Sequence, residues 1–577
     1  MVNRRGFIGG LGGAAAISSI PSYAVVSDKP LFTAGLITDT HIGKTKDSCK
    51  CVKAAWELFA KARVDLVANL GDIADHHYPT GYVAYRETVD EVLSANAGWK
   101  PRELYVYAWH DAYDYKGDIN RSVPRYREAF ADVAKYLRAN GSFAEIELGG
   151  CAVLVFPQML TADEYVRYEK TIKRAIDSHP GRPVFVLDHI PPFGTVSGSS
   201  SGSGDARRKA ILDGCPSVIA VTGHVHGTIL EEKHIWQGNF TVVNCGCMYK
   251  WGGSLVGRSV PSRFARNAVI MEVYRDHVLF RRFPDALEPA EHEPQSPWRV
   301  DIPYARDSAQ YLPEKAAARE VVSGFASGAA LSVKPVGSPM ESVRVSFPAA
   351  ERPPNMYKVE AYVKGADGNL VRALRRDMFG EYDIPAAKRA KTLCLDIPSG
   401  YLEPDADYVF TACPYGSFGK EGPSVKAGFR APAKFASLGG EKIYEVRGAS
   451  EVLPVFQGWN GAKSIATCDA KGVYALKPGV MRFHLPERLW EDPVGTRYRC
   501  ECDFRLVNER RGSNLVSIAC PRPLRYFGRV RTPPGDTGCI RTIVEFSKTA
   551  ERQRFDFCVE GGGKCSFEIR KLALYRC

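Results

Sequence analysis

Acidic and imidazole side chains follow apolar runs at five places in the first half of the chain. Short apolar runs of this kind are typical of buried strands, so each polar pair stands where a strand would end. Carboxylate and imidazole together suit zinc, manganese or iron, whereas thiolate-rich or all-oxygen sets favour other ions. The stretches are LITDTHIG with Asp39 and His41, ANLGDIAD with Asp72 and Asp75, VYAWHDAYD with His110 and Asp111, FVLDHIPP with Asp188 and His189, and AVTGHVHG with His224 and His226.

The spacing within these stretches allows two side chains to reach one ion. Residues i and i+2 of extended chain project to the same side, as in the pair Asp39/His41 and the pair His224/His226. The glycine before Asp72 allows a tight turn that presents the carboxylate. One carboxylate can give an oxygen to each of two ions about 3.5–4 Å apart, a spacing that suits hydrolysis of phosphate esters. The pattern therefore predicts a metal centre suited to that chemistry.

Strands that alternate with helices must bring the five stretches together. From Leu31 to about Pro303, apolar segments are separated by amphipathic ones such as SCKCVKAAWELFAKAR and TADEYVRYEKTIKRAIDS. This alternation predicts an α/β fold with a buried, largely parallel sheet, and residues 267–283 are expected to form a closing hairpin. Catalytic groups of open α/β sheets collect at the carboxyl ends of the strands, where all five stretches lie.

The order of the motifs resembles the calcineurin-like metallophosphoesterases. The family signature runs Asp-x-His, Gly-Asp, Gly-Asn-His-Asp/Glu, His and Gly-His-x-His, and this chain has DTH, GDIAD, AWHD, LDH and GHVH in that order. The resemblance covers residues 32–283, about half of the chain. It implies an α/β/β/α sandwich and an enzyme that hydrolyses phosphoric monoesters or diesters with a metal-bound hydroxide.

The resemblance also implies roles for individual residues. Two divalent or trivalent transition-metal ions (Mn, Fe or Zn) would be the cofactors. His110 would approach the phosphate and the leaving group, oriented by Asp111. One ion would be held by Asp39, His41, Asp72 and His226, and the second would share Asp72 and take His189 and His224.

Trp109 departs from the family pattern, which has a metal-ligating Asn at this position. An indole offers only an N–H donor and cannot ligate a metal. A water or a nearby acid, Asp75 or Asp114, could complete the second site; alternatively, one ion is held firmly and the other loosely, or the site is degenerate and non-catalytic. Trp109 and His76 are candidate substrate contacts, and a packing role for the indole stays open.

The first 24 residues have the layout of an export signal. Arg4 and Arg5 precede an apolar, Gly-rich run that ends in the small-residue stretch Ser22–Ala24, and the Arg-Arg-x-Phe-Ile order resembles a twin-arginine signal. We therefore expect a periplasmic, cell-surface or extracellular protein. No other segment has the uncharged length needed to span a bilayer.

The second half of the chain changes to short alternating strands with turn residues. We expect the metallophosphoesterase domain at 30–303, a linker at 304–316 and two all-β domains. Residues 317–432 resemble a fibronectin type III domain, because Leu402, Pro404 and Tyr408 match the spacing of its tyrosine corner. Residues 433–577 resemble a jelly-roll β-sandwich of the carbohydrate-binding kind.

Composition limits the classes of function that the chain can serve. The chain is 45% hydrophobic and 25% charged, which argues against gross disorder, and its net charge of +12 is modest for 577 residues. No nucleic-acid recognition motif is present, so we expect a phosphorylated small molecule, glycan or lipid as substrate. The alternative is a retired phosphoesterase domain that serves as a glycan- or surface-binding protein.

Overall fold

The computed structural model describes most of the chain beyond residue 28. The export-signal prediction for residues 1–24, together with His76 and Asp114, lies outside the described part. Among the described helices, none combines the length and apolar character needed to cross a membrane. The described residues are 29–43, 47–75, 79–112, 123–200, 204–249, 266–291, 295–364, 368–436, 439–446, 455–457, 467–468, 473–476, 479–506, 514–521, 524–532, 538–561 and 565–577.

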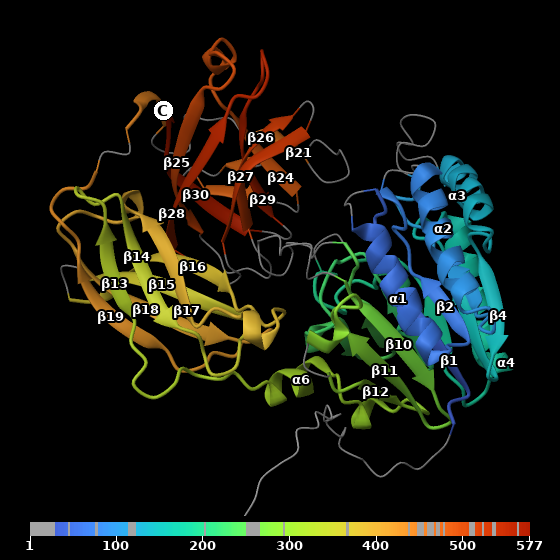
Figure 1. The fold of residues 1–577 in the computed structure, drawn as a ribbon. Coiled ribbons are helices and arrows are strands. Elements are labelled where there is room, and N and C mark those ends of the chain that lie inside the picture. The colour runs from blue at the N-terminus through green and yellow to red at the C-terminus, as the bar shows by residue number, and fades with distance from the viewer. Residues whose placement is uncertain are drawn as a thin grey trace, which may run out of the picture.

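Two six-stranded sheets form the first, mixed α/β part of the molecule (Figure 1). In the first sheet, β1 (Phe32–Ile37), β2 (Leu66–Asn69) and β3 (Arg102–Tyr105) are parallel. The expected closing hairpin is confirmed, because β10 pairs with β11 in antiparallel register beside β1. The sheet has the order β12-β11-β10-β1-β2-β3, with β10 at Ala268–Val273, β11 at His277–Phe283 and β12 at Trp298–Asp301.

The second sheet has the order β4-β5-β6-β7-β9-β8, and its inner strands β5, β6, β7 and β9 are parallel. The prediction of one largely parallel sheet is therefore too simple, since each sheet also has antiparallel strands toward an edge. The bounds are β4 (Ala144–Leu148), β5 (Cys151–Val155), β6 (Val184–Leu187), β7 (Val218–Thr222), β8 (Ile235–Gln237) and β9 (Thr241–Asn244).

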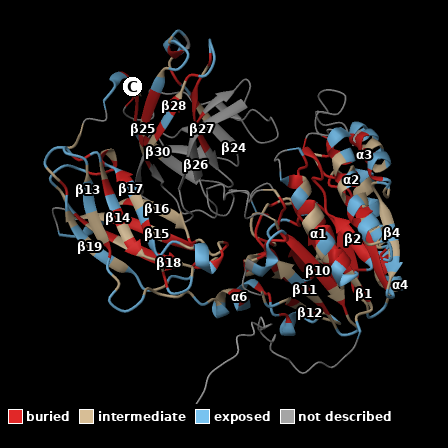
Figure 2. Ribbon diagram, in the orientation of Figure 1, coloured by how far each residue is buried: buried red, intermediate tan, exposed pale blue. Residues whose placement is uncertain are grey.

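The two sheets share one apolar core, which explains why their strands are apolar on successive residues. Phe32 of β1 meets Phe185 of β6 edge to face, with ring centroids 5.7 Å apart. Every residue of β2, β6 and β7 is buried, and β2 is coloured as buried in Figure 2. Burial on both faces fixes the sheets rigidly, so the loops at the strand ends start from fixed points.

Helices cover the remaining faces of the sheets. On the first sheet lie α1 (Ser48–Ala62), α2 (Pro79–Ala95) and α3 (Val123–Leu137), whose buried residues share a second apolar cluster. On the second sheet lie α4 (Ala162–Ser178) and α5 (Ala206–Leu212). Helix α4 begins with a capping box, in which the Thr161 hydroxyl accepts from the Glu164 N–H and the Glu164 side chain accepts from the Thr161 N–H.

The part that follows the α/β part is all-β apart from short helical turns. A short helix, α6 (Pro313–Arg319), leads into residues 331–431, which we call the second module (Figure 1). Its two sheets have the orders β13-β14-β17 and β16-β15-β18-β19 and share one core around Phe347, Tyr357 and Phe410. The strands are β13 (Ser332–Val336), β14 (Ser342–Pro348), β15 (Met356–Lys364), β16 (Leu370–Phe379), β17 (Thr392–Pro398), β18 (Asp407–Tyr415) and β19 (Val425–Arg430).

The described residues between 439 and 577 form two further sheets, which we call the third module. One has the order β22-β23-β30-β25-β28, with β20 also paired to β30, and the other has the order β21-β24-β29-β26-β27. The strands are β20 (Glu441–Val446), β21 (Val455–Gln457), β22 (Thr467–Cys468), β23 (Val473–Leu476), β24 (Gly479–His484), β25 (Arg497–Leu506), β26 (Asn514–Pro521), β27 (Leu524–Thr532), β28 (Gly538–Ser547), β29 (Asp556–Gly561) and β30 (Cys565–Arg576).

Candidate metal centre

The loops after β1, β2, β3, β6 and β7 bring three groups of ligand-type atoms together. Within each group, the histidine nitrogens and carboxylate oxygens lie within 4.8 Å of one another. Two residues, His41 and Asp72, each belong to two groups, so the groups form one continuous cluster. The groups are Asp39, His41, Asp72 and His226; Asp72, His189 and His224; and His41, Asp75 and His110.

The first group has short distances between atoms that could share one ion. Nε2 of His226 lies 3.0 Å from Oδ1 of Asp39 and 3.2 Å from Nε2 of His41. Nε2 of His41 lies 3.7 Å from Oδ2 of Asp72. Two ring nitrogens in contact cannot both carry protons directed at each other, whereas both can direct lone pairs at a cation.

The second group adjoins the first through Asp72. Nε2 of His189 lies 3.2 Å from Oδ2 of Asp72 and 3.9 Å from Oδ1 of Asp39. The ring of His224 stands 5.0 Å from that of His189. Asp72 is thus placed to give oxygen to an ion in either group, as a bridging carboxylate does.

The loops that carry the cluster adopt left-handed backbone conformations at five non-glycine residues. Such conformations cost about 1–3 kcal/mol each and persist only where the surroundings enforce them. They are typical of functional sites, because regular strand geometry would point the side chains elsewhere. The φ angles are 51° at Asp39, 41° at His41, 50° at Asp72, 69° at His224 and 47° at His226.

Backbone hydrogen bonds join the loops to one another. The Asp39 N–H donates to the Gly71 carbonyl at 2.9 Å and the His41 N–H to the Asp72 carbonyl at 3.0 Å. The His224 N–H donates to Oδ2 of Asp39 at 2.9 Å. The first, second and last motifs therefore support each other even before any ion is considered.

Some buried ligand atoms of the cluster make no hydrogen bond. Oδ1 of Asp39 accepts none, although Nε2 of His226 is close, and Nε2 of His189 is likewise unsatisfied. Both residues are fully buried, where an unsatisfied polar atom is costly. A cation coordinated by these atoms would remove that cost, so the donor set fits one or two transition-metal ions.

The pKa shifts within the cluster also favour a bound cation. Burial alone would lower the pKa of His189, but the carboxylates of Asp72 and Asp39 outweigh it and raise that pKa to about 10. Burial would raise the pKa of Asp39, yet the neighbouring imidazoles His226 and His189 hold it below its usual range. The carboxylates thus demand positive charge nearby, which a metal ion supplies in place of protons.

Trp109 is engaged in packing. Its half-buried indole packs against the apolar cluster beneath α3, and its ring centroid lies 5.8 Å from that of Tyr126. Its backbone N–H donates to Oε1 of Gln158 at 2.7 Å. The packing role that the sequence left open is therefore the one the contacts describe.

Asp75 is the carboxylate that meets the imidazole of His110. Oδ1 of Asp75 lies 3.0 Å from Nδ1 of His110 and 3.4 Å from Nδ1 of His41. Asp111, expected to orient His110, instead accepts hydrogen bonds at 2.9 Å from the N–H groups of Ile73 and Ala108. These bonds hold the loops after β2 and β3 together, while Asp75 is the carboxylate beside the His110 ring.

Two further residues contribute to the site, and no motif in the sequence signalled them. Tyr249 places its ring 5.1 Å from that of His41 and 6.1 Å from that of His226. Arg208, fully buried on α5, donates through Nε to Oδ2 of Asp188 at 2.7 Å. Asp188 therefore anchors the loop of His189 through an ion pair with Arg208, a contact between segments that local spacing does not encode.

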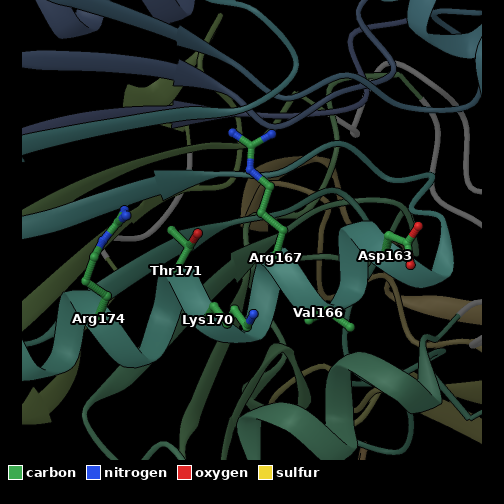
Figure 3. Close-up of a pocket in the computed structure, with 6 residues that line it drawn as sticks. All are labelled: Asp163, Val166, Arg167, Lys170, Thr171 and Arg174. Atoms are coloured by element: carbon green, nitrogen blue, oxygen red, sulfur yellow. The ribbon is translucent and has the colours of Figure 1, made fainter.

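A shallow hollow on the outer side of α4 holds none of the candidate side chains (Figure 3). Arg167 and Lys170 of this helix point in different directions in the close-up, so their charges do not converge. The hollow is lined by Asp163, Val166, Arg167, Lys170, Thr171 and Arg174. The chemistry of the α/β part is therefore assigned to the cluster at the strand ends.

Comparisons with known proteins give only weak likenesses. No protein-family model and no curated protein sequence matches the chain. A dimetal phosphatase from Danio rerio is 12% identical and aligns over 48% of this chain and 100% of its own, with a TM-score of 0.34. The xylan-binding CBM22-1 domain of Xyn10C from Paenibacillus barcinonensis is 9% identical over 24% of this chain and 97% of its own, with a TM-score of 0.19.

An exo-β-1,3-galactanase from Phanerochaete chrysosporium is 10% identical over 54% of this chain and 65% of its own, with a TM-score of 0.19. At such TM-scores the likeness supports no functional assignment. The assignment therefore depends on the side chains of the cluster.

We expect the substitution Gly223→Ala to damage the cluster. A Cβ at this position would lie 1.9 Å from Oγ1 of Thr38 and 2.7 Å from Oδ2 of Asp39, so the loop of His224 must move. Metal affinity should fall about tenfold or more, as measured by metal content after dialysis against a Mn²⁺ series. Gly214→Ala is the matched control, since its Cβ meets only the Ile211 carbonyl at 3.9 Å; equal metal content in both variants would contradict the expectation.

We also expect acid sensitivity from His234, which is fully buried with neither ring nitrogen hydrogen-bonded. Burial, with the charge of Lys233, lowers its pKa from 6.5 to about 3. As the pH falls, His234 is therefore protonated in the unfolded chain before it is protonated in the folded chain. The free energy of unfolding consequently decreases between pH 6.5 and about 3. In urea unfolding with chelator present, the free energy of unfolding should fall by about 1.4 kcal/mol less per pH unit in His234→Leu than in the unmodified chain. An identical pH slope in both proteins would refute this.

Proposed function

We propose that the chain is a metal-dependent phosphoric ester hydrolase. The observation that carries the proposal is the convergence of Asp39, Asp72 and His226 with unsatisfied buried ligand atoms between them. Carboxylates and imidazoles that converge around buried, unsatisfied ligand atoms are an arrangement that a cation stabilises. The shared carboxylate of Asp72 favours a two-ion centre over a single structural ion.

The residues that would hold the ions follow from the groups. When bound, such ions polarise phosphoryl oxygens and lower the pKa of water, which is the chemistry that ester hydrolysis requires. The imidazole of His224 is suited to binding a metal, because burial and the charge of His189 lower its pKa to about 4 and keep it neutral. We assign Asp39, His41, Asp72 and His226 to one ion, and Asp72, His189 and His224 to the other.

His110 is the proposed proton donor to the leaving oxygen. Burial acts to lower its pKa, but the neighbouring carboxylates of Asp75 and Asp72 raise that pKa overall, which favours the protonated ring that a proton donor requires. With Nδ1 turned to Asp75, Nε2 is the atom we assign to the substrate. Asp75 acts as the positioning residue, and Asp111 keeps the loop in place.

The second ion would have three protein ligands. Trp109 cannot ligate, and Asp75, one candidate for completing this site, contacts His41 and His110 instead. We propose that solvent completes the second coordination sphere and that its ion is the more weakly held.

The remaining parts of the chain extend the proposal. We propose a metallophosphoesterase domain at 30–303, a linker at 304–316, a fibronectin type III-like domain at 317–432 and a carbohydrate-binding β-sandwich at 433–577. The hydroxyl of Tyr408 accepts from the Glu403 N–H at 2.6 Å, as a tyrosine corner does. With residues 1–24 as a twin-arginine signal, the enzyme would act outside the cytoplasm on a phosphorylated small molecule, glycan or lipid.

Substituting His110 and Asp72 separates chemistry from metal binding. We expect His110→Gln to lower kcat about a hundredfold or more, through loss of the proton donor, while metal content is kept. Asp72→Asn should lose both metal and turnover. The measurement is Mn²⁺-dependent hydrolysis of p-nitrophenyl phosphate and bis-p-nitrophenyl phosphate, with metal counted in parallel.

Asp163→Asn, on the outer side of α4, is the matched control and should behave as the unmodified chain. Absence of turnover on both esters, with metal bound, would contradict the proposal. Together with binding to a glycan array, that outcome would favour the retired, glycan-binding alternative.

Trp109 should matter for stability because its indole packs on Tyr126. Trp109→Asn should lower the free energy of unfolding by about 2–3 kcal/mol, somewhat less than truncation of a fully buried aromatic residue. Trp109→Phe should retain most of the free energy of unfolding that the asparagine variant loses. Thermal unfolding of both variants checks this. An asparagine variant that is as stable as the unmodified chain and more active would show instead that the indole impairs the second site.

A further inference from the structure

The stretch that follows His226 reaches from the metal cluster to the second module. We call residues 227–234 the docking loop; it ends where β8 begins. The loop is compact, with the Glu231 N–H donating to the Thr228 carbonyl at 3.1 Å and the His234 N–H to the Glu231 carbonyl at 3.0 Å. Glu231 therefore belongs to a short, internally bonded segment that begins directly after His226.

The carboxylate of Glu231 is held by the second module. Asn355 donates through Nδ2 to Oε1 of Glu231 at 2.8 Å, and the hydroxyl of Tyr382 bonds to the same oxygen. Glu231 is only 7% exposed, and burial raises its pKa. A buried carboxylate depends on its donors, so loss of either one weakens the contact more than loss of a surface hydrogen bond would.

Contacts within the second module hold Asn355 and Tyr382 in place. Asn355 precedes β15, and its carbonyl accepts from the Gly380 N–H at 3.0 Å. Tyr382 follows β16 and packs on Phe379 with ring centroids 5.0 Å apart. The second module therefore presents a fixed edge to the docking loop.

The other end of the docking loop supports the histidine directly. A Cβ on Gly227 would lie 1.8 Å from Cε1 of His234, so the ring of His234 lies against the backbone beside His226. The carbonyl of Lys233 accepts from the Ser197 N–H at 2.9 Å, in the segment that follows His189. The loops that carry His189 and His226 therefore both contact residues 233 and 234.

Side-chain contacts around the docking loop strengthen the same interface. Nζ of Lys233 lies 5.1 Å from the ring centroid of Phe418 in the second module. Glu320, just after α6, accepts from the Phe418 N–H at 2.9 Å and from the hydroxyl of Ser417 at 3.1 Å. Arg319 of α6 pairs with Glu232. The interface therefore has several fixed points and is not a single contact.

We propose that the second module positions His224 and His226 by holding Glu231 of the docking loop through Asn355 and Tyr382. The second module then belongs to the support of the metal centre and is more than a spacer. The left-handed backbone at both histidines needs enforcement from outside the loop, and this interface supplies it. The inference rests on the metal centre of the proposed function, but not on the reaction catalysed there.

The test uses the full chain and two conservative substitutions, Tyr382→Phe and Glu231→Gln. Each weakens the contact without adding bulk. We expect the dissociation constant for Mn²⁺, measured by electron paramagnetic resonance of the free ion, to rise about tenfold. Amide hydrogen exchange of residues 223–234 should also become faster in the metal-free chain, because the loop loses its anchor.

Tyr408→Phe is the matched control, since it removes a hydrogen-bonded hydroxyl within the same module. It should leave Mn²⁺ affinity and exchange of residues 223–234 unchanged. Unaltered affinity and exchange in both interface variants, or equal effects in the control, would overturn the inference. If the unmodified chain binds no Mn²⁺, the proposed function fails, while the exchange comparison still decides whether the second module holds the loop.

Discussion

The structure depends on the burial of two carboxylates, Asp39 and Asp72, in one small volume. Like charges that close together are unstable in an apolar interior unless positive charge and hydrogen-bond donors surround them. Imidazoles supply part of that charge. The backbone N–H of His224 donates to the Asp39 carboxylate, and the backbone N–H of His110 donates to that of Asp72 at 3.1 Å. Oδ1 of Asp39 and Nε2 of His189 make no hydrogen bond, and coordination of a cation would satisfy both atoms, which is the basis of the metal-centre assignment.

The same need explains why so much of the fold converges on the strand ends. Five left-handed residues cannot maintain their conformation alone, so neighbouring parts of the chain must enforce it. Asp111 ties the loops after β2 and β3 together, and the Asp188–Arg208 pair fixes the loop after β6. Asp111 and Asp188, both buried near the cluster, thus hold the loops in place, which explains why their charge is buried there.

The last of these supports lies outside the α/β part. The carboxylate of Glu231 in the docking loop is held by the second module, through Asn355 and Tyr382. A β-module that follows an α/β part is readily interpreted as a spacer. Contacts to a loop that directly follows the candidate ligands His224 and His226 instead support our inference that this module helps to hold the cluster.

The sequence by itself determined the chemistry and its local presentation. Acid and imidazole pairs two residues apart, each after an apolar strand, predicted a cluster at the strand ends, because side-chain direction along a strand is a local property. Only the tertiary structure decided which residues these side chains contact. Asp75 rather than Asp111 lies beside the ring of His110, and Trp109 packs under α3. Arg208 and Tyr382 come from distant segments, and they bond to Asp188 and Glu231. Contacts between segments far apart in the chain depend on how the sheets, helices and modules pack, and no spacing within a motif encodes that packing.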